Sequence, residues 1–86
     1  MAAAVPVGAM RSQALAADAV LALIDGFIAD PRLTADELFA LSDALTEWAA
    51  GDGVPLFSKL RITRRALAAA DAGRARASQE ALAHAI

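Results

Sequence analysis

The sequence contains no cysteine and no tyrosine, and it has one histidine and one tryptophan. Without cysteine, the chain can form neither a disulfide bond nor a thiolate metal site. A chain of 86 residues buries only about 60% of the surface that it exposes when unfolded. We therefore expect its own core to be small and its stability to gain from association with another chain.

Long hydrophobic runs are also absent. The longest, AVLALI at 19–24, lies between Asp18 and Asp25, and a membrane-spanning helix needs about 20 apolar residues. The opening MAAAVPVGAM has no basic residue ahead of an apolar block, as a secretory signal peptide would have. We expect a cytoplasmic protein without a membrane partner. The alanine- and arginine-rich composition is typical of a GC-rich bacterial source.

Residue patterns that support catalysis are lacking as well. The chain has no glycine-rich phosphate loop, and no acid or hydroxyl is placed beside His84 to orient it as a general base. Three acids, Asp36, Asp43 and Glu47, share one face of a predicted helix, but carboxylates need burial and a cleft to act as acids, bases or ligands. We expect no enzyme activity, no cofactor, no metal and no small-molecule substrate.

What the chain does contain is helix-forming sequence, including 25 alanines. It predicts an all-α protein, a small helical bundle of three main helices and a weaker C-terminal helix, which Gly73 separates from the third. Pro6 and Gly8 indicate a flexible N-terminal tail at 1–8, followed by a single domain at 9–86. The predicted helices cover residues 9–29, 34–50, 53–72 and 75–85.

The stretch DGFIADPRLTADEL at 25–38 resembles the second half of a calcium-binding EF-hand loop. If Glu37 is the twelfth loop position, Gly26 and Ile28 occupy the first and third positions, where oxygen ligands are required. Pro31 then occupies the sixth position, where the loop needs glycine. The ligand set is incomplete, so the pattern does not predict a calcium site.

The residues at 33–38 are instead typical of a helix start. Thr34 followed by Glu37 three residues later is a capping box, and Leu33 with Leu38 can form a hydrophobic staple. We therefore predict that the second helix begins at Thr34.

Apolar spacing assigns an inner face to each of the later helices. The predicted inner face of the second helix is Leu38, Leu41, Leu45 and Trp48, and that of the third helix is Leu56, Leu60, Thr63 and Leu67. This leaves a second apolar strip on the opposite side of the third helix and one aromatic residue at the flank of the second. These residues form the candidate protein interface: Phe39, Ile62, Ala66 and Ala69.

Charge is distributed unevenly along the chain. Residues 1–52 contain two basic and eight acidic residues, whereas residues 53–86 contain six basic and two acidic residues. The densest basic cluster, the candidate basic patch, comprises Lys59, Arg61, Arg64 and Arg65. Such a patch can bind phosphates or an acidic protein. It lacks interleaved aromatic residues and a nucleic-acid-reading motif, which favours the protein.

The sequence thus predicts a small non-enzymatic helical interaction protein: an adaptor, a regulator or an assembly factor. We expect it to associate with itself, as a homodimer, or with a larger protein. The alternative is a nucleic-acid-associated protein that uses the arginine-rich helix face.

Overall fold

The computed structural model describes the backbone of residues 7–85 and the side chains of residues 18–85. Residues 7–85 form three helices: α1 (Val7–Ala29), α2 (Ala35–Ala50) and α3 (Leu56–Ala85). No strand occurs within residues 7–85, so the predicted all-α class is confirmed. The predicted tail at 1–8 lies largely outside the described residues.

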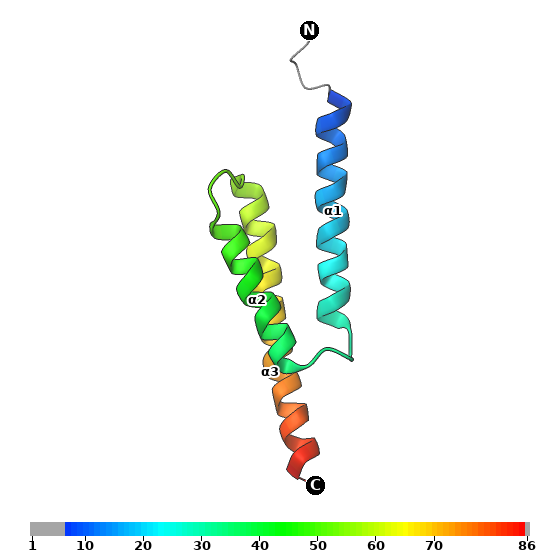
Figure 1. Cartoon of the computed structure of the whole chain (residues 1–86), viewed down its shortest axis with the longest axis vertical. Coiled ribbons are helices and arrows are strands. Elements are labelled where there is room, and N and C mark those ends of the chain that lie inside the picture. The colour runs from blue at the N-terminus through cyan, green and yellow to red at the C-terminus, as the bar shows by residue number, and fades with distance from the viewer. Residues whose placement is uncertain (1–6, 86) are drawn as a thin grey trace.

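The three helices form an elongated bundle (Figure 1). Helices α2 and α3 run antiparallel as a closely packed hairpin, and α1 lies beside this hairpin with the same direction as α3. The start of α1 and the end of α3 project beyond the hairpin at opposite ends of the molecule (Figure 1).

Small residues on α3 allow α2 to approach closely. Ala66, Ala69 and Gly73 are all buried, and they follow one another at helical spacing. The Phe39 ring of α2 packs directly over Gly73, so closely that a Cβ at Gly73 would lie 2.7 Å from the ring. The Ser42 hydroxyl donates a hydrogen bond of 2.7 Å to the Ala66 carbonyl oxygen across the same contact.

The hydrophobic core joins all three helices. Its buried members are Leu21 and Ile24 of α1, Leu45 of α2, and Ile62 and Ala66 of α3. Side chains that are partly buried surround this cluster: Ile28, Leu41, Ala49 and Val54. Among the described side chains of α1, Leu21 and Ile24 are therefore the two that are buried in this core.

Helix α3 buries the face opposite to the one predicted. Leu56, Leu60 and Leu67 are 59–73% exposed, so the prediction that they face the core is wrong. Periodicity favoured the largest side chains, but bulky leucines would hold α2 and α3 further apart than Ala66 and Gly73 do. The inner face of α2 is confirmed at Leu38 and Leu45, whereas Trp48 is 42% exposed.

The predicted break at Gly73 is also wrong, because α3 continues without interruption to Ala85. Glycine is compatible with this helix interior because its missing side chain makes room for Phe39. Further along α3, the Glu80 carboxylate accepts a hydrogen bond of 3.0 Å from the Ala35 backbone N–H. Arg76 donates to the Pro31 carbonyl oxygen. The C-terminal segment is therefore part of α3, tied to the start of α2.

Two short connections join the helices. In the first, the Asp30 carboxylate accepts hydrogen bonds from the Arg32 backbone N–H and guanidinium, which lower the pKa of Asp30. In the second, Gly53 has φ +80°, a left-handed conformation that favours glycine. This turn delays the start of α3 to Leu56, three residues after the predicted start.

Among the described residues, no helix has an apolar stretch of the length that crossing a bilayer requires.

Candidate interaction surfaces

The stretch at 25–38 forms a helix end, a turn and a helix start. Gly26 and Ile28 both lie within α1. The Thr34 hydroxyl accepts a hydrogen bond of 3.2 Å from the Glu37 N–H, and the Glu37 carboxylate accepts one of 3.0 Å from the Thr34 N–H. This confirms the predicted capping box. No cluster of three or more potential metal-ligating side chains occurs within residues 18–85.

The candidate interface predicted from the sequence is not exposed. Ile62, Ala66 and Ala69 are 0–4% exposed and belong to the chain's own interior, and Phe39 is half-buried against Gly73. The prediction that these four residues form a free surface is wrong, because the small-residue face of α3 is the one that binds α2.

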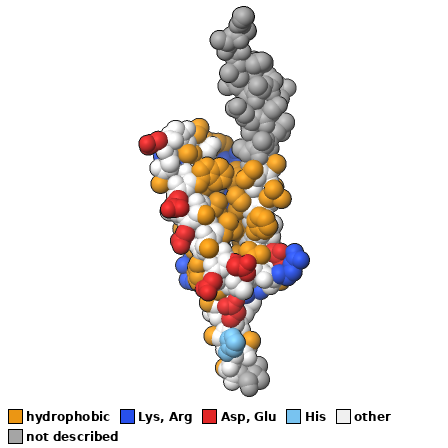
Figure 2. Space-filling model, in the orientation of Figure 1, with side chains coloured by type: hydrophobic (Ala, Val, Ile, Leu, Met, Phe, Trp, Pro, Cys, Tyr) orange, Lys and Arg blue, Asp and Glu red, His pale blue; other side chains and the backbone are white. Residues whose placement is uncertain are grey.

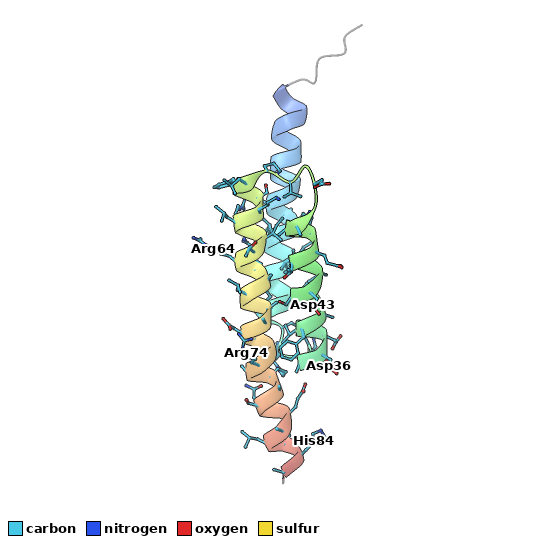
Figure 3. The ribbon with its side chains drawn as sticks, turned by 90° about the vertical axis from the view of Figure 1, so that its left-hand side faces the viewer. Asp36, Asp43, Arg64, Arg74 and His84 are labelled. Carbon is cyan, nitrogen blue, oxygen red and sulfur yellow. The ribbon has the colours of Figure 1, made fainter. Side chains whose placement is uncertain are left out.

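The candidate basic patch is divided between two directions. Arg61 and Arg65 face α1, where Arg61 forms an ion pair of 2.7 Å with Asp18 and Arg65 forms one of 3.0 Å with Asp25. Arg64 is exposed and projects away from α2 (Figure 3). Lys59 is half-buried. Two of the four bases therefore attach α1 to α3, which reduces the positive charge available to a ligand.

A first exposed apolar surface lies over α1 and α2. Figure 2 shows hydrophobic side chains gathered there, with acidic side chains along the left edge and below them and a basic side chain at the lower right. Its large exposed members are Val20, Leu23 and Phe27 of α1 and Trp48 of α2, each 42–63% exposed. We call these four residues the α1–α2 patch. Asp36, Asp43 and Glu47 of α2 are exposed, and Asp36 and Asp43 project away from α3 (Figure 3).

A second exposed apolar surface lies on α3. Its members are Leu56, Phe57, Leu60 and Leu67, each 59–73% exposed, and we call them the α3 stripe. A shallow depression within it is lined by Phe57, Leu60, Arg61 and Arg64. The Arg61 guanidinium lies 5.7 Å from the centre of the Phe57 ring, close enough for a cation–π contact. Apolar and basic groups thus share this surface.

The α3 stripe was missed in the sequence because its large apolar residues were assigned to the core. The signal that could have found the α3 stripe is the row Ala66, Ala69 and Gly73, since small residues at helical spacing mark a close helix contact. For the α1–α2 patch, the signal is that α1 is apolar around most of its circumference between Val20 and Ile28.

The remaining polar candidates are distributed over the surface. His84 lies in the last turn of α3 and is exposed (Figure 3). The acidic residues of α2 are exposed along its outer side, and none of them is close to His84 in the sequence.

Comparison with known proteins gives no match: no family model, no curated protein and no solved structure is significantly similar to this chain.

Proposed function

We propose that this protein is a small non-enzymatic helical interaction protein that associates with copies of itself or docks on a larger protein. The observation that carries this proposal is the number of large apolar side chains that the folded chain leaves exposed. Among residues 18–85, nine of them are 42–73% exposed, and eight of these belong to the α1–α2 patch or the α3 stripe. Large apolar patches on a small protein mark sites of protein–protein interaction.

The composition of the two surfaces supports the same proposal. Aromatic residues, which are enriched at the centres of protein interfaces, occur in both: Phe27 and Trp48 in the α1–α2 patch, and Phe57 in the α3 stripe. The interior of the bundle is already occupied by large apolar side chains: Leu21, Ile24, Leu38, Leu45 and Ile62. The exposed aromatic residues are therefore not needed to fill the core. These surfaces are therefore available for intermolecular contacts.

The ion pairs favour a protein partner over nucleic acid. A phosphate-binding surface needs several bases that can reach the same backbone. Arg61 and Arg65 instead neutralise Asp18 and Asp25 within the chain.

The concentration dependence of thermal unfolding tests this proposal. Association stabilises the folded chain by mass action, so we expect the melting temperature to rise with protein concentration. Leu60→Glu places a charge on the α3 stripe and should remove most of that rise. Gln79→Glu adds the same charge at an exposed position outside the stripe, and it should leave the rise unchanged. A wild-type melting temperature that is constant with concentration would argue against self-association.

A further inference from the structure

We propose that the chain associates head to tail, with the α1–α2 patch of one copy seated on the α3 stripe of the next. This inference rests on the proposed function and specifies the partner and the faces that meet. It follows from the positions of the two surfaces and from the charges beside them.

The two surfaces point in different directions. In Figure 3, Asp36 and Asp43 of α2 project to one edge of the hairpin, and Arg64 and Arg74 of α3 project to the opposite edge. The α1–α2 patch lies on the acidic side, over α1 and α2 (Figure 2). The α3 stripe lies on the basic side, because Leu60 and Arg64 are one helical turn apart and line the same depression.

The charges beside the two surfaces are opposite. Helix α2 contains four acidic residues and no basic residue. The segment of α3 that contains the stripe, residues 56–67, has four basic residues and no acidic residue. Arg61 and Arg65 pair with acids of α1, which leaves Lys59 and Arg64 as its unpaired positive charge among the described side chains. Contact between two α1–α2 patches would bring acidic helices together, and contact between two α3 stripes would bring basic helices together. Contact between unlike surfaces places opposite charges side by side, which favours the head-to-tail arrangement.

The apolar groups of the two surfaces are also suited to each other. The α3 stripe extends over 11 residue steps, about 16 Å of helix, with leucines on either side of a shallow depression. The α1–α2 patch offers Phe27 and Trp48, two rigid aromatic side chains that can fill a depression of this kind. The exposed Arg64 lines that depression, so an acidic neighbour such as α2 of the second copy would complement it.

A head-to-tail contact uses a different surface on each copy. Each pair of chains therefore keeps one α1–α2 patch and one α3 stripe exposed. Such contacts produce either a closed ring or an open series of chains, not a pair that stops at two. The wild-type protein should accordingly form species larger than a dimer as its concentration rises.

A mixing experiment with two surface variants tests this geometry. Leu23→Glu disables the α1–α2 patch and leaves the α3 stripe intact, and Leu60→Glu does the reverse. Each variant alone should be monomeric in sedimentation velocity, with self-association weakened about tenfold or more. An equimolar mixture should form a 1:1 heterodimer that grows no further, since its two remaining surfaces are both disabled. Circular dichroism checks that both variants retain the wild-type helix content, and Gln79→Glu is the charge-matched control.

The outcomes separate this inference from the proposed function. If the wild type self-associates and the mixture forms no heterodimer, the head-to-tail arrangement is wrong and self-association stands. The arrangement is also wrong if either variant alone still dimerises as the wild type does, because a symmetric contact would need only one of the two surfaces. If the wild type and the mixture are both monomeric at every concentration, the head-to-tail arrangement and self-association are both wrong, and only docking on a larger protein is left of the proposed function.

Discussion

At the scale of single residues, Gly73 and Phe39 determine how closely α2 and α3 approach. The Phe39 ring occupies the space that a side chain at position 73 would need. Gly26 in α1 offers a comparison, since it is also helical but has no neighbouring atom within 4 Å of the position of a Cβ.

We expect Gly26→Ala to stabilise the protein and Gly73→Ala to destabilise it. Replacing glycine in a helix interior gains roughly 0.5–1 kcal/mol, and nothing opposes this gain at Gly26. At Gly73 the new methyl group displaces the Phe39 ring, and overpacking of this kind costs roughly 1–3 kcal/mol. Urea unfolding measures both changes. In a Phe39→Ala background, Gly73→Ala should become stabilising; if it destabilises there equally, the ring is not the cause.

The capping box should make a measurable contribution. Thr34→Ala removes the acceptor of the Glu37 N–H, and we expect a loss of about 1 kcal/mol in the free energy of unfolding. Thr34→Ser keeps a hydroxyl at this position and should lose much less. Equal losses for the two variants would mean that the hydroxyl does not cap α2.

Stability should fall on acidification, partly through Glu37. Its hydrogen bonds with Thr34 lower the pKa of Glu37 below the ordinary value of 4.5. A carboxyl group whose pKa is lower in the folded state stabilises the fold above its ordinary pKa, and this contribution disappears as the pH falls through the folded-state value. Urea unfolding from neutral to acidic pH should show a smaller acid loss for Glu37→Gln than for the wild type. Identical losses would contradict this role.

At the scale of helices, the sequence predicts the start of α2 but neither the extent of α3 nor the face that α3 buries. The start of α2 was predictable because Thr34 and Glu37 are neighbours in sequence and satisfy each other locally. The orientation of α3 was not predictable from its own sequence. It depends on how closely α2 can approach Ala66, Ala69 and Gly73, which is determined by the two helices together. The continuity of α3 through Gly73 and the contact of Glu80 with Ala35 depend on the same pairing.

The link from Glu80 to α2 gives a prediction at this scale. Ala35 is buried, so Glu80→Ala leaves its N–H without the carboxylate acceptor that it has in the fold. Losing such a partner costs roughly 1–3 kcal/mol. Glu80→Gln retains an acceptor oxygen and should be closer to the wild type, and the exposed neighbour Gln79→Ala should change stability by less than about 0.5 kcal/mol. Chemical denaturation compares the three, and a neutral Glu80→Ala would show that α3 does not support the start of α2.

At the scale of the whole molecule, the chain is an elongated bundle whose opposite charges and exposed apolar groups are arranged on different faces. The α3 stripe was not placed from the sequence, because the small-residue face of α3 was taken for an outer strip although it is the face that binds α2. The candidate interface failed for this reason, and the basic patch was divided because Arg61 and Arg65 pair with α1.

Nucleic-acid binding should accordingly be weak. Gel-shift assays at low salt should show loose association that disappears near physiological salt, because few bases are free to displace counterions from phosphates. Tight binding at physiological salt that Arg64→Gln abolishes would instead support the nucleic-acid alternative. Gln79→Glu, which changes the charge by one unit elsewhere, controls for the change in net charge.

The central claim is that the exposed apolar surfaces bind other copies of the chain, and sedimentation equilibrium of the intact protein tests it most directly. The chain has a mass of 8.8 kDa. We predict a weight-average mass that rises with concentration from micromolar to millimolar and passes the value of a dimer. A mass that stays at 8.8 kDa over that whole range would contradict the claim.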